Sequence, residues 1–210
     1  MQTIKTIVLT GGPCAGKSTA MGWIQSTFTD RGYKVLVVPE TATELITGGV
    51  APWTCGTNAD YQCLQFQLQE FKENIFQKAA KTMKNEKILI VCDRGMMDNK
   101  VYMTDEEYVE VVERIHLDEE MQRNKYDAIF HLETAAKGEK EAYLSNKDGN
   151  AARIETVEQA CTIDQKLIAA WNGHPCFYTI ESTRDFNRKM KQVVSKIADF
   201  LGEPSPYEDL

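Results

Sequence analysis

The sequence predicts an α/β fold in which a five-stranded parallel β-sheet lies between two layers of helices. Apolar runs of strand length alternate along the chain with longer segments of helical periodicity, the pattern typical of parallel strands joined by crossover helices. A glycine-rich turn containing a lysine joins the first apolar run to the first helical segment. The length of 210 residues suits one domain, which we place at 1–203, with 204–210 as a flexible tail.

Each expected strand is a short run rich in Val, Ile, Leu or Phe. In chain order the expected strands are 4–10, 34–39, 87–92, 127–132 and 175–180. The run Ile88-Leu89-Ile90-Val91-Cys92 shows no apolar–polar alternation, which is typical of a central strand buried on both faces of a parallel sheet.

The expected helices fill the intervals between these strands. In chain order they are 16–31, 41–47, 58–84, 104–125, a helix from about 154, and 184–201. On the third helix, Gln62, Gln65, Phe66 and Gln69 share one face, which we expect to pack against the core. The alternative is that this face lines a ligand pocket.

A polar insert at 134–153 does not fit a minimal arrangement of sheet and helices. It carries Lys137 and Lys140 and precedes the helix that begins near 154. In an open α/β sheet such an insert lies beside the carboxyl ends of the strands, where ligands bind. We therefore expect a mobile lid here, with a solvated pair of surface helices as the alternative.

The composition is that of an ordinary globular protein. Charged residues make up 26%, and the net charge of −7 argues against a protein that binds nucleic acid by bulk electrostatics. No apolar stretch approaches the ~20 residues that span a bilayer, and the first residues lack the pattern of a signal peptide. The six cysteines form no Cys-x-x-Cys pair, so we expect reduced thiols and a cytoplasmic protein without a membrane partner.

The most specific motif is a phosphate-binding loop that matches G-x-x-x-x-G-K-[ST] between a strand and a helix. A chance match in a chain of this length is on the order of one in a hundred. Glycine lets the backbone turn so that successive amides form an anion site at the helix N-terminus. The nucleotide-binding residues expected here are Gly11, Gly12, Pro13, Cys14, Ala15, Gly16, Lys17, Ser18 and Thr19. Lys17 is expected to reach the β- and γ-phosphates and Ser18 to ligate Mg²⁺, with ATP as the nucleotide and GTP also open.

Two further strands end in acidic residues. Asp93 and Arg94 follow the third strand, where a carboxylate suits Mg²⁺ and a guanidinium suits phosphate. Glu40 follows the second strand and could accept or orient the proton of an acceptor hydroxyl. Arg153, at the end of the polar insert, is placed to reach transferring phosphate. The alternatives are helix capping for the two acids and exposed ion pairs for the arginines.

These residues together resemble the small AAA-domain P-loop ATPases. The resemblance rests on 11–19, on Pro39-Glu40-Thr41-Ala42-Thr43 and on Asp93-Arg94-Gly95. That group includes ribosylnicotinamide-kinase-like domains and the amino-terminal domain of the TRPL-translocation-defect family, and it is similar more broadly to nucleoside and nucleotide kinases. The resemblance implies a P-loop NTPase three-layer sandwich.

By the same resemblance, Lys17 would bind the transferring phosphate, and Ser18 and Asp93 would hold Mg²⁺. Asp93 could instead act as the base. Glu40 would contact the acceptor hydroxyl, and Arg94 and Arg153 would contact phosphates.

The function that these observations favour is phosphoryl transfer from ATP, with Mg²⁺, to a hydroxyl of a small nucleoside-like metabolite. One alternative is an NTPase or nucleotide-dependent switch that acts through a protein partner. The sequence lacks GTPase motifs in register, since Asp93-Arg94-Gly95 and Asn146-Lys147-Asp148 are each one residue out. Another alternative, a kinase for nucleic-acid ends, is disfavoured by the acidic charge balance. The sequence leaves the oligomeric state and the choice of base between Glu40 and Asp93 open.

Overall fold

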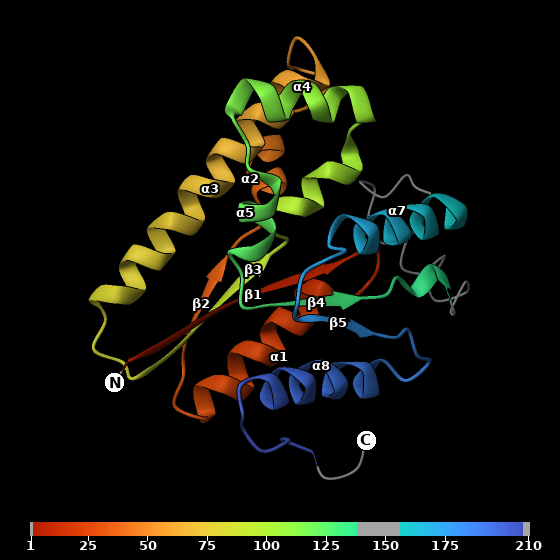
Figure 1. The fold of residues 1–210 in the computed structure, drawn as a ribbon. Helices are drawn as coiled ribbons and strands as arrows, with labels where there is room; N and C mark the ends of the chain where they lie inside the picture. The colour runs from red at the N-terminus through yellow and green to blue at the C-terminus, as the bar shows by residue number, and fades with distance from the viewer. Residues whose placement is uncertain (1, 138–155, 208–210) are drawn as a thin grey trace.

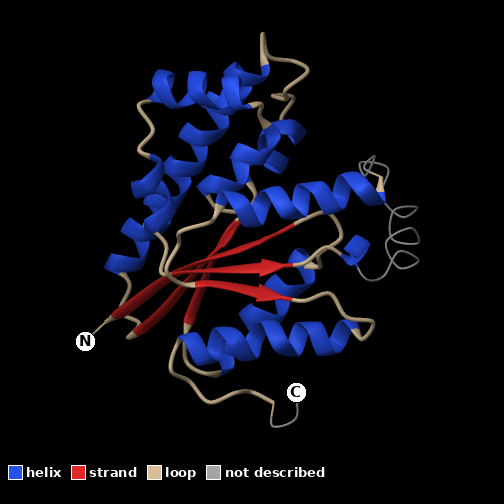
Figure 2. Cartoon of the chain, turned by 45° about the vertical axis from the view of Figure 1, so that its right-hand side comes forward, coloured by secondary structure: helices blue, strands red, loops and turns tan. Residues whose placement is uncertain are grey.

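The computed structural model describes residues 2–137 and 156–207, and its centre is the predicted five-stranded parallel sheet (Figure 1). The strands are β1 (Thr3–Gly11), β2 (Lys34–Val38), β3 (Lys87–Asp93), β4 (Ala128–Leu132) and β5 (Phe177–Ile180). Their order in the sheet is β2-β3-β1-β4-β5, and every pairing is parallel. All five carboxyl ends therefore meet at one edge, as the arrowheads in Figure 2 show.

The central strands are apolar because helices cover both faces of the sheet. Ile7 of β1 lies in register between Val91 of β3 and Ala128 of β4, and all three are fully buried. All five residues of β4 are buried as well. Continuous burial of this kind explains why the strands read as unbroken apolar runs.

Two helices cover one face of the sheet and most of the others cover the opposite face (Figure 1). On the first face, α1 (Lys17–Asp30) and α8 (Phe186–Phe200) pack in a core that includes Ile24, Phe28 and Val194. On the second face, a separate core around Phe66 and Trp171 joins the sheet to the helices there. The helical elements contributing to this second core are α3 (Asn58–Thr82), the 3₁₀ helix η1 (Met96–Tyr102), α4 (Asp105–Ile115) and α7 (Val157–Ala170).

Three short elements complete the described fold. They are α2 (Thr41–Thr47), α5 (Glu119–Asn124) and the 3₁₀ helix η2 (Ala135–Lys137). The predicted single helix at 104–125 is wrong, because His116 adopts a left-handed conformation with φ 52° and ends α4. The side chain of Asp118 then caps the start of α5. The 3₁₀ helix η1 is not among the predicted elements; its seven residues follow directly after Asp93-Arg94-Gly95.

Only the first four residues of the predicted lid are described. Residues 138–153 of that insert, with Lys140 and Arg153, lie outside the described residues. The predicted tail is described from 204 to 207, where it contacts α1 and α8. The ring centroid of Tyr207 lies 6.3 Å from that of Trp23, and the Ser205 hydroxyl donates to that of Ser195 at 3.0 Å.

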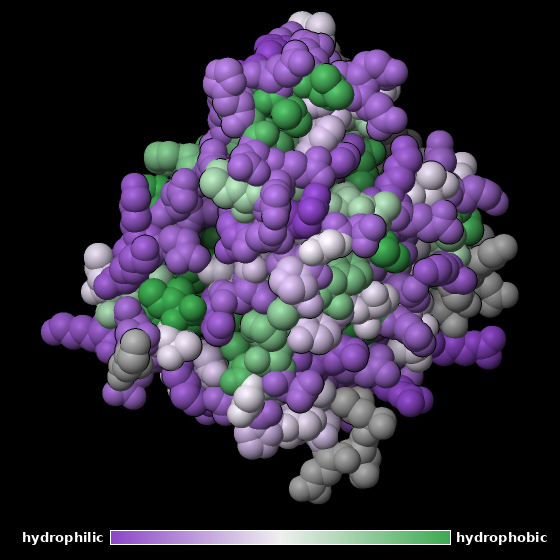
Figure 3. Space-filling model, in the orientation of Figure 1, coloured by the Kyte–Doolittle hydropathy of each residue, from purple (hydrophilic) through white to green (hydrophobic). Residues whose placement is uncertain are grey.

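The face of the molecule in Figure 3 is mostly hydrophilic, with apolar side chains in small patches that polar residues interrupt. Among the described segments, no helix is both long enough and apolar enough to cross a membrane. The six cysteines are all described, and none of them forms a disulfide.

Candidate functional site

The phosphate-binding loop lies between β1 and α1, where the motif predicted it. Gly11 and Gly16 have φ angles of 151° and 89°, a region that disfavours residues with a Cβ. A Cβ on Gly11 would collide with the carbonyl oxygen of Leu132, and one on Gly16 would lie 2.8 Å from the ring of Phe186. The two glycines of the motif are therefore required both by backbone conformation and by close neighbours.

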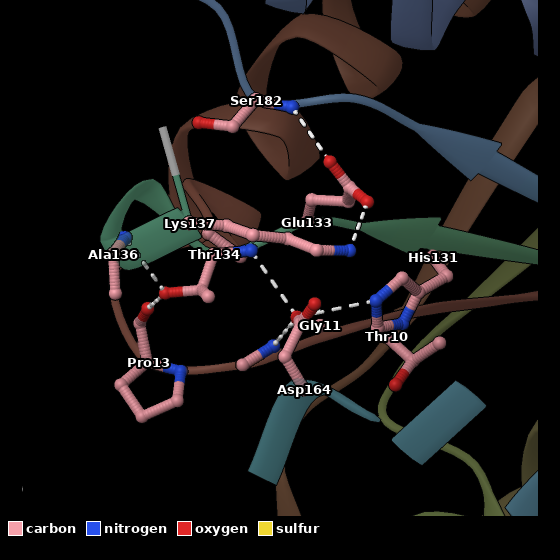
Figure 4. A network of polar contacts seen from close by, with 12 residues as sticks. Thr10, Gly11, Pro13, His131, Glu133, Thr134, Ala136, Lys137, Asp164 and Ser182 are labelled. Carbon is pink, nitrogen blue, oxygen red and sulfur yellow. Dashed lines mark hydrogen bonds and ion pairs between the residues drawn. The ribbon is translucent and has the colours of Figure 1, made fainter. Parts of the chain in front are cut away.

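A buried carboxylate supports the loop from behind (Figure 4). The Oδ1 atom of Asp164 accepts hydrogen bonds from the backbone amides of Gly12, at 3.2 Å, and Thr134, at 3.1 Å. Nε2 of His131 lies 3.2 Å from the same oxygen. Burial acts to raise the pKa of Asp164, but His131 and the two amides outweigh it and lower that pKa. The carboxylate thereby joins the loop to the carboxyl end of β4 and to α7.

Two further side chains hold carbonyl oxygens of the loop. The hydroxyl of Thr134 donates to the carbonyl of Pro13 at 2.5 Å, as Figure 4 shows. Lys189, on α8, is buried, and its Nζ donates to the carbonyls of Ala15, at 2.9 Å, and Glu133, at 2.6 Å. Burial lowers the pKa of Lys189 to about 8. The loop is thus fixed by groups from β4, α7 and α8 as well as by its own turns.

Sequence reasoning missed Asp164, Thr134 and Lys189, although two of them carry a signal. Asp164 lies on the buried side of α7, between Ala160 and Leu167, and Lys189 is buried beside Met190 on α8. A charged residue on the apolar side of an amphipathic helix needs a buried partner. The pattern could have flagged both residues, but it does not name their partners.

Four of the predicted catalytic residues come together beside this loop. Glu40 follows β2, Asp93 ends β3, and Lys17 begins α1. Arg94 has a positive φ of 70°, and its Nε forms a short ion pair with Oε1 of Glu40. Lys17 Nζ and Arg94 Nη1 each donate to the carbonyl of Gly11 at 3.4 Å. The arrangement gathers two cations and two carboxylates at the carboxyl edge of the sheet.

Arg94 is engaged with Glu40 in this structure, whereas the sequence analysis expected it to contact phosphate. The other carboxylate oxygen of Glu40 accepts from the hydroxyl of Thr43 at 2.5 Å. Both oxygens of Glu40 therefore have partners. Asp93 differs, because its Oδ1 is buried and has no hydrogen-bond partner among the described residues.

The environment moves the pKa values of the two carboxyl groups in opposite directions. Burial raises the pKa of Asp93, with Lys17 as the main opposing charge. Burial also acts to raise the pKa of Glu40, but Arg94, Thr43 and Lys17 together lower it. The pKa of Lys17 is lowered to about 8, chiefly by burial and then by repulsion from Arg94. The site therefore holds one firmly ionised carboxylate and one buried carboxylate that would gain from a cation.

A cleft of about 590 Å³ extends from these residues towards α3. Its lining residues are Pro13, Cys14, Lys17, Ser18, Glu40, Ala42, Thr43, Ile46, Pro52, Asn58, Tyr61, Gln62, Gln65, Asp93, Arg94 and Tyr102. Gln62 and Gln65 line the cleft, while Phe66 packs in the apolar core. This face of α3 therefore both packs against the core and lines the cleft, which were the two alternatives drawn from the sequence.

Two of the residues that line the cleft from α3 have polar atoms without a partner in the described part of the chain. Tyr61 and Gln62 are almost fully buried, and Oη of Tyr61 and Oε1 of Gln62 form no hydrogen bond within the described residues. A buried polar atom without a partner is costly, so such atoms point to a ligand that completes them.

A second buried carboxylate anchors the turn that carries Asp93 and Arg94. Asp98, fully buried in η1, accepts from the hydroxyl of Thr10 at 2.5 Å and from the amide of Gly95 at 2.7 Å. The indole N–H of Trp171 donates to it at 3.1 Å. Asp98 therefore ties the end of β1 to the turn after β3.

The fold and the motif have counterparts among known proteins. A family model described as an AAA domain matches residues 6–189. No curated protein matches the sequence. A solved structure of deoxyadenosine kinase from M. mycoides with bound dATP is similar in fold. Its TM-score is 0.58 and its sequence identity 15%, over 92% of this chain and 98% of that one.

Proposed function

The chain belongs to the AAA-domain family whose model matches residues 6–189, and we propose that it is a kinase that uses ATP and Mg²⁺. Its acceptor is a hydroxyl group of a small nucleoside-like molecule. The observation that carries the proposal is the cleft of about 590 Å³. It is lined by the phosphate-binding loop, by two carboxylates and by polar atoms that have no partner among the described residues. A protein that only bound and hydrolysed a nucleotide would need no space lined with polar side chains beside its phosphate-binding loop.

The donor nucleotide binds along the loop between β1 and α1. The backbone amides of the loop and the N-terminus of α1 receive the phosphates, and Lys17 contacts the transferring phosphoryl group. The glycines and the buried supports of the loop keep these donors in place before the nucleotide arrives, so little reorganisation accompanies binding.

The residues present fit a magnesium ion. Oδ1 of Asp93 is a buried acceptor without a partner among the described residues, and Ser18 offers an exposed hydroxyl at the start of α1. These oxygen ligands suit Mg²⁺, which also takes water and phosphate oxygens. When bound, the ion neutralises charge on the phosphates as the phosphoryl group transfers.

Glu40 holds the acceptor hydroxyl and receives its proton. Its ion pair with Arg94 and its hydrogen bond from Thr43 fix the carboxylate at the start of the cleft. Arg94 neutralises charge on this side of the site, and its guanidinium is kept in place by the left-handed backbone and by the carbonyl of Gly11. Asp93 is then left as the magnesium ligand, because its buried Oδ1 has no partner among the described residues and would gain from a cation.

The test is nucleotide turnover by the purified protein with Mg²⁺, with ATP and GTP in parallel and nucleosides added one at a time. We expect one class of nucleoside to accelerate ADP release and to yield a phosphorylated product, detected by mass spectrometry. Lys17→Ala should abolish both. Turnover that no acceptor stimulates, together with tight nucleotide binding, would refute the kinase and favour a switch that acts through a protein partner.

A further inference from the structure

A line of buried amide side chains runs from the cleft into the protein interior. Nε2 of Gln65 donates to Oδ1 of Asn99 at 2.5 Å, and Nδ2 of Asn99 donates to Oε1 of Gln69 at 2.9 Å. Nε2 of Gln69 in turn donates to Oε1 of Glu73 at 3.0 Å. All four side chains are more than nine-tenths buried, so each hydrogen bond of the line is made without competition from water.

The inner end of this line fixes the direction of every hydrogen bond in it. Glu73 forms an ion pair with Lys125 at 2.6 Å and accepts from the hydroxyl of Tyr126 at 2.9 Å, so it acts as an acceptor. Gln69 must then present its N–H group to Glu73 and its oxygen to Asn99. The backbone carbonyl of Arg94, which can only accept, also accepts a hydrogen bond from Nε2 of Gln69 at 3.4 Å. It therefore requires the same orientation of the Gln69 amide.

The direction is transmitted to the outer end of the line. Since Gln69 accepts from Asn99, the oxygen of Asn99 remains for Gln65, and Gln65 must use its N–H group there. Gln65 lines the cleft, so the polar atom that it offers to a ligand is its carbonyl oxygen. The neighbouring Gln62 also has a buried carbonyl oxygen without a partner among the described residues.

We propose that Asn99 is a positioning residue that holds Gln65 with its oxygen towards the cleft, so that the acceptor molecule is selected by an N–H donor on its base. This inference rests on the proposed function, because it concerns the acceptor of the same cleft. Two carbonyl oxygens favour a base edge that carries an amino group, and they disfavour the same base without it. A site built to receive a hydrogen-bond donor discriminates strongly, because its buried acceptor is left unpaired by the wrong molecule.

The test compares nucleosides that differ by one amino group. Adenosine is paired with purine riboside, and cytidine with pyrimidin-2-one riboside, and each molecule is measured for kcat/KM with ATP and for binding by calorimetry. For the wild type we expect one amino nucleoside to be preferred about 10-fold or more over its partner. The preference should lie mainly in KM and in binding, because the base is remote from the transferred phosphoryl group.

Variants of Asn99 separate the positioning role from a purely structural one. Asn99→Leu removes the acceptor for Gln65, whose amide can then turn. The ratio of kcat/KM for the amino nucleoside to kcat/KM for its partner should then fall towards one. Asn99→Asp keeps an acceptor for Gln65 and should retain the preference even if the protein is less stable. Gln122→Leu is the matched control, since it removes another buried amide that donates to α3, at Glu70, away from the cleft. It should leave the preference unchanged.

Gln65→Leu keeps the proposal testable if Asn99→Leu does not fold, because it removes the discriminating oxygen from the cleft wall. It should also lower the preference well below that of the wild type, because only the oxygen of Gln62 is left to receive the amino group. An Asn99→Leu or Gln65→Leu protein that keeps the preference would overturn the inference, as would a wild type that binds neither member of a pair or binds both equally. Turnover without discrimination would leave the kinase standing and remove the inference. Binding that discriminates between the two nucleosides without phosphoryl transfer would support the inference and refute the kinase.

Discussion

Replacing Lys17 with methionine should make the nucleotide-free protein more stable at pH 7 while abolishing phosphoryl transfer. The lysine is placed for the phosphates of a bound nucleotide, and without them its ammonium group lies partly buried beside Arg94. Methionine keeps the length of the aliphatic stem and removes the charge. It also removes the hydrogen bond to the carbonyl of Gly11, which is long at 3.4 Å.

The lowered pKa of Lys17 gives the size of the effect. Burial and Arg94 bring the pKa from its ordinary 10.5 to about 8. At about 1.4 kcal/mol for each pKa unit, this corresponds to roughly 3 kcal/mol against the charged form in the folded state. Solvent reaches part of the side chain, so we expect Lys17→Met to raise the free energy of unfolding by about 1–3 kcal/mol at pH 7.

The advantage of the variant should disappear as the pH rises. Between about 8 and 10.5 the unfolded wild type holds a proton on Lys17 that the folded wild type has lost. The free energy of unfolding of the wild type therefore increases with pH in this window, relative to a variant that lacks the group. Below about pH 8 the full difference remains, and above about 10.5 it vanishes.

The assay is urea denaturation followed by tryptophan fluorescence, for both proteins at several pH values from 7 to 9.5. Lys78→Met, on the exposed side of α3, is the control for the loss of a surface charge and should change the free energy of unfolding by less than about 0.5 kcal/mol. A variant no more stable than the wild type at pH 7, or a difference that does not shrink towards pH 9.5, would refute the reasoning. ATP should raise the melting temperature of the wild type only.

Three further predictions concern the carboxylates and the turn after β3. Glu40→Gln should lower kcat about 100-fold or more, because it removes the proton acceptor, and rapid-quench kinetics measure this loss. The affinity for ATP, measured by calorimetry, should stay within a few-fold of the wild type. Asp164→Asn should lower the free energy of unfolding by about 1–3 kcal/mol at pH 7, as two amides lose a charged acceptor. Since the pKa of Asp164 is lowered in the folded state, this deficit should narrow in urea titrations as the pH falls below about 4. Gly95→Ala should cost about 1–3 kcal/mol by the same assay, because a Cβ would lie 2.6 Å from the ring of Trp171; an unchanged urea midpoint would contradict it.

The strands and the phosphate-binding loop could be predicted because their causes are local. A strand buried on both faces must be apolar throughout, and the loop needs glycine where φ is positive, as at Gly11 and Gly16. Each expected strand lies within about two residues of the observed one. The break at His116 is hard to predict, because histidine adopts the left-handed conformation more often than most residues but still only uncommonly.

The supports of the site escaped the sequence analysis for a different reason. Asp164 contacts Gly12 across 152 positions of the chain, and Lys189 contacts Ala15 across 174. A polar residue on the apolar face of a helix indicates that it has a buried partner, but only the fold determines which atom that partner is. The role of Asn99 is harder still to predict from the sequence. It depends on the donor-to-acceptor direction of its hydrogen bonds, which Glu73 sets through Gln69.

The two parts of the site differ in how they are held, and the difference has a functional reason. The loop is held by groups that do not belong to it: Oδ1 of Asp164 accepts from two backbone amides, and Thr134 and Lys189 donate to loop carbonyls. The charged cluster is held largely by its own opposite charges: Arg94 pairs with Glu40, Asp93 and Glu40 attract Lys17, and both cations reach the carbonyl of Gly11 only at 3.4 Å. The formal charges of these four groups cancel, so the arrival of a triphosphate with Mg²⁺ brings a net negative charge that Lys17 and Arg94 must share. A rigid loop combined with an exchangeable set of ion pairs thus allows the nucleotide to replace internal partners without disturbing the backbone that binds it.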